Sequence, residues 1–296
     1  MAHFVARGFI RFDAVVPDAI NQQFLDDIGD VADRSESPMT QYGKIMQSSV
    51  VPLVPAGTKL NQAYPKDSAL NKLVRLPEIK GAIDSLVGTG SLVDHHFLHI
   101  TFPPKHYPKG YEQVAQPYHQ DSTIDPRQAF DVQLFYFPHE VTLDMGGTRF
   151  VPGTHLRVVS EAAIARYQNI QGQQHVVCPA GTVMFFHMGL WHGGGLNLSE
   201  QLRYMFKIRL CPTKRQSRLW NFSDREQQRP QRPIFWTGGP RDETNLHAIL
   251  TKPEKWFEAD TGRLEYLNRI KLWRYITNDK NFDADYWLTR VENEYR

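Results

Sequence analysis

The chain has 296 residues, of which 41% are hydrophobic and 22% charged, and its formal net charge is +2. This length and composition suffice for one domain with a substantial core. The near-neutral charge gives no reason to expect nucleic-acid binding, and no apolar run is long enough to cross a membrane. Cys178 and Cys211 are too few for a disulfide framework, and residues 1–7 contain no apolar signal core. We therefore expect a cytoplasmic protein.

The first ninety residues predict a strand, a helix, a loop and further helix, in that order. Aromatic and branched side chains mark the strand, and an apolar stripe at helical spacing marks the first helix. Four prolines mark the loop. The expected ranges are 8–16 for the strand, 17–32 for the helix, 35–66 for the loop and 67–88 for helical structure with a break at Pro77.

Short strands separated by turns dominate the next part of the chain. They are expected at 92–102, 130–137, 175–178, 182–187 and 201–210, with a helix or insert at 157–170. Such spacing is typical of two facing antiparallel sheets. We predict a mainly β fold, a double-stranded β-helix (jelly-roll, cupin-like) core with flanking helices at both ends.

The last third of the chain has a different character. Residues 213–232 are basic, and we expect a solvated loop there rather than an anion site. Residues 241–296 predict a helical extension that packs on the barrel or makes a dimer contact. We treat residues 1–296 as a single domain, with its core at about 8–212.

Two histidines and a carboxylate suggest a metal site. In Tyr118-His119-Gln120-Asp121, an extended backbone would point His119 and Asp121 to the same side. The best candidate for a third ligand is His192, followed by three glycines. Two imidazoles and one carboxylate can occupy one face of Fe(II) and leave positions for a co-substrate and oxygen. Farther along, Arg203 offers a planar, permanently charged fork for a carboxylate.

Other histidines offer alternative metal ligands. His95, His96 and His99 lie in one predicted strand. Alternation places His95 and His99 on one face and His96 on the other, so the three do not converge. We expect one of them to line a substrate pocket instead. A further residue, His187, competes with His192 for the third ligand position.

Several motifs in order resemble one family. They are Pro117–Asp121, Gly146–His155, Pro179–His187 leading into Trp191-His192, and Arg203. Together they resemble the phytanoyl-CoA dioxygenase family of Fe(II)/2-oxoglutarate oxygenases, from about Gly8 to about Pro212. The resemblance implies Fe(II), 2-oxoglutarate as co-substrate and O₂. It also favours His192 over His187, and it favours Arg203 over Lys207 and Arg209 as the ligand of the far 2-oxoglutarate carboxylate.

Thr148 and Gln133 are candidate cofactor contacts that each have a structural alternative. Thr148 either lies near the 2-oxoglutarate carboxylate, as the resemblance suggests, or bonds to backbone. Gln133 either faces the co-substrate or points outward. We expect His155 to be structural. The candidates for substrate contact are His99, Lys105, His106 and Arg149.

The expected activity is oxidation of a C–H bond in a small-molecule substrate, a polar metabolite or a natural-product intermediate. Hydroxylation is the default, and cyclisation, desaturation or epimerisation are alternatives; the co-products are succinate and CO₂. The first rival is a cupin-like metal enzyme that does not use 2-oxoglutarate. Arg203 distinguishes the two hypotheses, because its loss should abolish 2-oxoglutarate dependence in the oxygenase and spare activity in the rival. The second is a non-catalytic jelly-roll binding module, against which the intact triad argues. We expect a monomer or homodimer.

Overall fold

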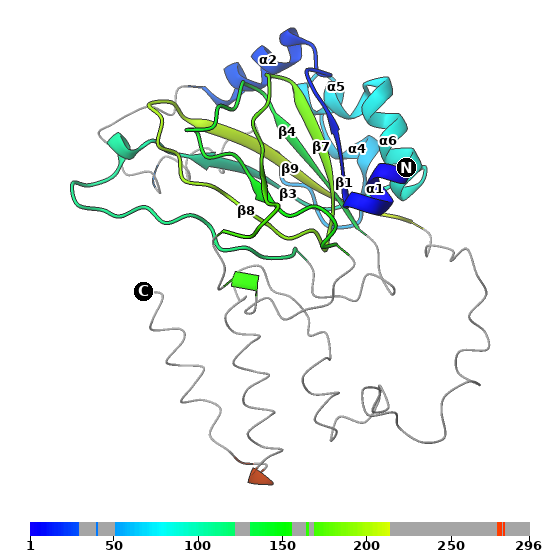
Figure 1. Ribbon diagram of the computed structural model, residues 1–296. Helices are drawn as coiled ribbons and strands as arrows, with labels where there is room; N and C mark the ends of the chain where they lie inside the picture. Colours follow the sequence, from blue (N-terminus) through cyan, green and yellow to red (C-terminus); the bar gives the residue numbers. More distant parts are fainter. Residues whose placement is uncertain are drawn as a thin grey trace.

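Two antiparallel sheets form the centre of the computed structural model (Figure 1). It describes residues 1–29, 40, 51–121, 131–155, 164–165, 169–213, 277–279 and 281. The larger sheet has the order β1-β7-β4-β9-β3-β2, and the smaller has the order β6-β5-β8. Their bounds are β1 Phe9–Phe12, β2 Thr58–Lys59, β3 Leu92–Thr101, β4 Val132–Phe137, β5 Arg149–Phe150, β6 Gln174–His175, β7 Thr182–His187, β8 His192–Gly193 and β9 Arg203–Cys211. The predicted mainly β, double-stranded β-helix fold is confirmed.

Helices cover one face of the larger sheet, as Figure 1 shows for α2, α5 and α6. The helices are α1 Ala2–Arg7, α2 Asp18–Ile28, α4 Leu60–Ala63, α5 Ala69–Arg75 and α6 Pro77–Val87, with a short 3₁₀ turn, η1, at Pro104–His106. Ser68 caps α5 by accepting a hydrogen bond from the Asn71 amide at 3.2 Å. Pro77 begins α6, where a missing amide hydrogen is tolerated, so the predicted break is confirmed.

Alternation along the central strands creates two separate cores. On β4, Leu134 and Tyr136 pack among the helices, in a core that also contains Phe24 and Leu73. The intervening residue, Phe135, packs between the two sheets. Because successive side chains on a strand point to opposite faces, one strand serves both cores. The site lies on the inner side, between the sheets.

Several predicted boundaries were wrong. The strand expected at 8–16 covers only Phe9–Phe12, because the preceding residues form α1 and Gly8 ends that helix with φ 81°. The first predicted helix ends at Ile28 rather than Ala32, where Gly29 takes φ 71°. The strand expected at 175–178 is only β6, because Cys178 leaves that strand and pairs with Val141 in an isolated bridge.

Other predictions fall almost wholly outside the described residues. These are the insert at 157–170, the basic stretch at 213–232 and the C-terminal extension at 241–296. Within the described ranges, no helix combines the length and apolar character needed to cross a membrane.

Candidate metal centre

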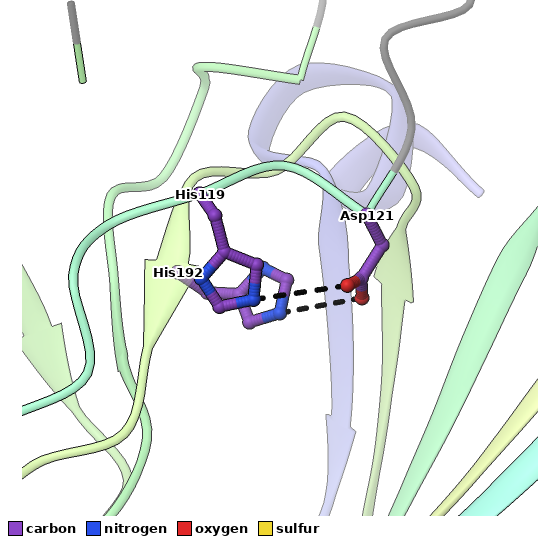
Figure 2. A group of neighbouring side chains, drawn as sticks. All are labelled: His119, Asp121 and His192. Atoms are coloured by element: carbon purple, nitrogen blue, oxygen red, sulfur yellow. Dashed lines mark ion pairs between the residues drawn. The ribbon is translucent and has the colours of Figure 1, made fainter. Parts of the chain in front are cut away.

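His119, Asp121 and His192 converge at one end of the space between the sheets (Figure 2). The distance from His119 Nε2 to Asp121 Oδ1 is 3.7 Å, and that from His192 Nε2 to Asp121 Oδ2 is 3.3 Å. One candidate ligand atom from each residue lies within 4.8 Å of the others. Among the described residues, this is the only such group of histidine, cysteine and acidic side chains.

Backbone hydrogen bonds hold the three residues in register. The amides of His119 and His192 each donate to the other's carbonyl, at 2.9 and 3.0 Å, and the Asp121 amide donates to Met188 O at 3.1 Å. The pairing of His119 with His192 is an isolated β-bridge outside the two sheets' named strands on the His119 side. A Cβ on Gly193 would lie 2.8 Å from two carbonyl oxygens, so glycine permits this close approach.

Both imidazoles turn the same nitrogen inward. Nδ1 of His119 bonds to Pro117 O at 3.0 Å, and Nδ1 of His192 bonds to Leu190 O at 2.8 Å. A carbonyl can only accept, so Nδ1 carries the proton and Nε2 keeps its lone pair. Burial, and then the neighbouring His192, lower the pKa of His119 to about 4. His119 is therefore neutral at neutral pH, as a metal ligand must be.

Asp121 is held ionised despite its burial. Burial raises its pKa, but Lys207 and then His192 and His119 oppose this and hold the pKa well below its usual range. The centre thus offers one carboxylate and two imidazoles whose Nε2 atoms face inward. Such a donor set suits a divalent transition metal with positions left open, and Fe(II) in particular.

Arg203 is a buried cation at the start of β9, with only 6% of its surface exposed. Its Nη2 donates to Thr101 Oγ1 at 2.7 Å and its Nη1 to Met145 O at 3.4 Å. No carboxylate among the described residues pairs with it. Burial lowers the pKa of Arg203 to about 10, which still leaves the guanidinium charged at neutral pH. The surroundings therefore favour a ligand that brings a carboxylate.

A cavity of about 370 Å³ connects Arg203 with the triad, and all four side chains line it. This volume lies within the range of small-molecule sites.

His187 does not reach this cavity. It follows Phe186 on β7, so its side chain points to the opposite face of the sheet, away from the space between the two sheets. On that outer face, the rings of Phe4 and His155 lie beside the His187 ring. Its Nδ1 accepts a hydrogen bond from the Gly189 amide at 3.0 Å. As expected, His155 has a structural contact: its Nε2 bonds to Val5 O at 2.9 Å.

A family model described as phytanoyl-CoA dioxygenase (PhyH) matches residues 4–205. The chain belongs to this family. Human peroxisomal phytanoyl-CoA dioxygenase is 24% identical to it over 216 residues, which cover 66% of this chain and 62% of the human protein. The chain thus spans less than two thirds of that relative's length.

Solved structures share the fold of this family member. A non-haem α-ketoglutarate-dependent carbocyclase from nogalamycin biosynthesis, SnoK, has a TM-score of 0.51 and 18% identity, over 79% of this chain and 91% of SnoK. The apo form of the non-haem monooxygenase ThoJ has a TM-score of 0.50 and 18% identity, over 94% of this chain and 98% of ThoJ.

Two further predicted site residues of this family member line the cavity, Thr148 and His99. Thr148 is buried, and its hydroxyl donates to Met205 Sδ at 3.7 Å. The Nε2 atom of His99 is buried and has no hydrogen-bond partner among the residues that the structure describes. Burial, followed by the charge of Lys207, lowers the pKa of His99 to about 3. It is therefore a neutral group available to a ligand.

Gln133 lies away from the Arg203 end of the cavity. It is fully buried, and within the described ranges neither polar atom of its amide has a hydrogen-bond partner. Gln133 lies on β4, and its partner on the neighbouring strand β9 is Arg209. At the usual rise per residue, Arg209 is about 20 Å along β9 from Arg203. The structure therefore does not bring Gln133 and Arg203 together.

Three predicted substrate contacts do not line the cavity. Lys105 is exposed and pairs with Glu200 Oε2 at 3.1 Å. His106 is buried, with its ring centroid 5.5 Å from that of Phe102. Arg149 donates to Gln116 O at 2.7 Å and lies over the ring of Tyr118. Their contacts in the structure are with neighbouring protein groups.

Sequence reasoning missed one participant and misjudged two others. Thr101, which orients Arg203, was not singled out. Lys207 and Arg209 were considered only as rivals of Arg203, whereas both contact Asp121. Alternation along β9 could have predicted the positions of Lys207 and Arg209, because it places both on the same face as Arg203. The contact of Thr101 with Arg203 depends on the register of β3 against β9, which the sequence does not reveal.

Proposed function

We propose that this protein is an Fe(II)- and 2-oxoglutarate-dependent oxygenase that oxidises a C–H bond of a small molecule. One observation carries the proposal. A single cavity holds two inward-facing imidazole nitrogens, an ionised carboxylate and a buried arginine that lacks a carboxylate partner among the described residues. The first three groups fit iron, and the arginine fits the dicarboxylate co-substrate.

His119, Asp121 and His192 would hold the metal. When bound, iron together with 2-oxoglutarate and O₂ supplies the oxidising chemistry, and succinate and CO₂ are released. The chain contributes orientation, because hydrogen bonds to carbonyls fix both imidazole rings. It also limits water, since Phe135 and Phe186 pack beside His192 with ring centroids at 5.8 and 6.0 Å.

Arg203 would bind the far carboxylate of 2-oxoglutarate. Thr101 accepts from one terminal nitrogen and the Met145 carbonyl from the other, which holds the guanidinium plane in place. Thr148 lines the same cavity and would add a hydroxyl near this carboxylate.

The cavity volume supports a small substrate, a polar metabolite or a natural-product intermediate. His99 is the polar side chain we assign to substrate contact, since it lines the cavity and its Nε2 is buried with no hydrogen-bond partner in the described part of the chain. We take hydroxylation as the default outcome, a cytoplasmic setting and one domain over the whole chain. Cyclisation, desaturation and epimerisation would use the same site and would differ from hydroxylation in the orientation of the substrate in the cavity.

The test is 2-oxoglutarate affinity of the metal-loaded protein, measured calorimetrically without oxygen. Removing one partner of a buried, hydrogen-bonded charge pair costs about 2–5 kcal/mol, so Arg203→Met should weaken binding by a factor of about 30 or more. Arg203→Lys should lose less, because it keeps the charge but not the fork. Lys105→Met is the control, since Lys105 lies outside the cavity. Unchanged affinity in Arg203→Met would mean that another group holds the far carboxylate, and no 2-oxoglutarate binding by the metal-loaded wild type would favour a cupin-like enzyme that does not use 2-oxoglutarate.

A further inference from the structure

Strand β9 of the larger sheet holds the aspartate of the triad at two points. Lys207 Nζ lies 3.5 Å from Asp121 Oδ2, and Arg209 Nη1 donates to the Asp121 carbonyl at 2.9 Å. Asp131 fixes the guanidinium in turn, because its Oδ2 accepts from Nη2 and Nε of Arg209 at 2.6 and 3.1 Å. Residue 121 is therefore tied to β9 through both its backbone and its side chain.

The ammonium that contacts the carboxylate is itself fixed by packing. Lys207 is 3% exposed and Asp121 is 1% exposed. On the neighbouring strands, Phe97 and Phe135 stand opposite Lys207, one on each side. The ammonium also lies 5.4 Å from the centroid of the Phe97 ring, a favourable cation–π distance. A lysine confined in this way has little freedom to leave the carboxylate.

We propose that Lys207 is a positioning residue that makes Asp121 bind the metal through one oxygen only. The inference rests on the proposed function. A carboxylate can offer one or both oxygens to a metal. Around a six-coordinate metal, two imidazoles, one carboxylate oxygen and a co-substrate that offers two atoms would leave one position open. A second carboxylate oxygen would fill that position, and the ammonium prevents this by engaging the carboxylate.

Metal affinity alone does not reveal this role. Removing the ammonium removes repulsion between it and a divalent cation, which strengthens metal binding. It also frees the carboxylate to rotate, which weakens metal binding, as loss of a partner of a metal ligand usually does. Because these effects oppose each other, the informative quantities are the coordination state and the availability of the open position.

The experiment compares Lys207→Met with Lys207→Arg and with Ile208→Val. Ile208 lies on the same strand but packs among the helices, so its variant controls for changes in the core. The first readout is the visible spectrum of the cobalt(II)-loaded proteins, which reports coordination number and needs no co-substrate. The second is the affinity of the Fe(II)- and 2-oxoglutarate-loaded proteins for nitric oxide, a probe of the open position, without oxygen.

We expect Lys207→Met to change the cobalt spectrum and to lower nitric oxide affinity by about tenfold, the lower end of the range by which losing a partner of a metal ligand lowers activity. Lys207→Arg and Ile208→Val should retain wild-type behaviour. A cobalt spectrum and nitric oxide affinity unchanged in Lys207→Met would overturn the inference. Should that variant not fold, Lys207→Gln takes its place with the same expectations, because its uncharged amide ends short of the ammonium position.

The cobalt readout separates the two claims. If wild-type protein binds cobalt(II) but 2-oxoglutarate leaves the spectrum unchanged, the proposed function fails, while the comparison of variants still decides the role of Lys207. If wild-type protein does not bind cobalt(II), both claims are overturned.

Discussion

His119 and His192 pair through their backbones, each amide donating to the other's carbonyl at 2.9 and 3.0 Å. Two metal-ligand candidates that are far apart in sequence are thus held side by side by backbone hydrogen bonds. This geometry depends on the close passage of Gly193 past the carbonyls of Gln116 and Pro117.

Gly193→Ala should weaken metal binding without altering any ligand. The added Cβ would lie 2.8 Å from the carbonyls of Gln116 and Pro117, so the backbone must move and the two histidines must separate. We expect metal affinity to fall by about tenfold or more, on the scale of other disturbances around metal ligands. Equilibrium cobalt(II) titration measures this. Gly194→Ala is the matched control, because its nearest contact would be an ordinary 3.5 Å; equal losses in both variants would contradict the account.

Thr101→Val should weaken 2-oxoglutarate binding while leaving metal binding intact. The substitution removes the hydroxyl that accepts from Arg203 Nη2 at 2.7 Å and leaves a buried charged donor unsatisfied. A lost hydrogen bond to a charged group is worth about 1.5–3 kcal/mol, so the dissociation constant should rise by a factor of about 10 to 150. Calorimetry on metal-loaded protein measures it. Thr101→Ser keeps the accepting hydroxyl and should bind 2-oxoglutarate as tightly as wild type does. An equal loss of 2-oxoglutarate affinity in Thr101→Ser would show that packing of the methyl group, not the hydrogen bond, is responsible.

Tyr136→Phe should destabilise the fold without touching the site. The Tyr136 hydroxyl donates to Asn21 Oδ1 at 2.7 Å, and Asn21 Nδ2 donates to Val16 O at 3.2 Å, which links α2 to the larger sheet. Leaving the buried amide oxygen without its donor costs about 1–3 kcal/mol. Urea unfolding measures the loss. In an Asn21→Leu background the same substitution should cost less, and an equal cost in both backgrounds would exclude this coupling.

His187 should make stability depend on pH. Burial, and then His155, lower the pKa of His187 to about 3. The unfolded chain therefore binds a proton at pH values where the folded chain does not, and stability is lost as pH falls from about 6.5 towards 3. Between pH 8 and pH 5 this loss is on the order of 2 kcal/mol. His187→Asn, which keeps an acceptor for the Gly189 amide but does not titrate, should lose less stability over that interval. The free energy of unfolding is measured with urea at both pH values. Equal losses of stability in wild type and His187→Asn would contradict the assignment to His187.

Much of the fold was predictable because alternation and turns are local signals. The strands at 92–102, 182–187 and 201–210 were found close to their observed bounds. The N-terminal helix α1 was missed, because six residues carry too little periodicity to recognise. Glycines with positive φ ended elements earlier than the apolar pattern suggested, as at Gly29.

The site was predictable where it rests on motifs and unpredictable where it depends on strand register. Residue types suggested the histidine–aspartate–histidine group, and the family resemblance favoured His192 over His187 and Arg203 over Lys207 and Arg209. Lys105 and Arg149 were chosen for polarity alone, and their partners, Glu200 and Gln116, are distant in sequence. The pairing of Thr101 with Arg203 needs the alignment of β3 against β9, which no local pattern encodes.

The central claim is that one centre binds iron and 2-oxoglutarate together. The most direct measurement is an anaerobic titration of the purified apoprotein with Fe(II) and then 2-oxoglutarate, following the visible metal-to-ligand charge-transfer band. The account predicts a band in wild-type protein that weakens in Asp121→Ala, His192→Ala and Arg203→Ala. Tight iron binding without a band, or a band of full strength in all three variants, would contradict it.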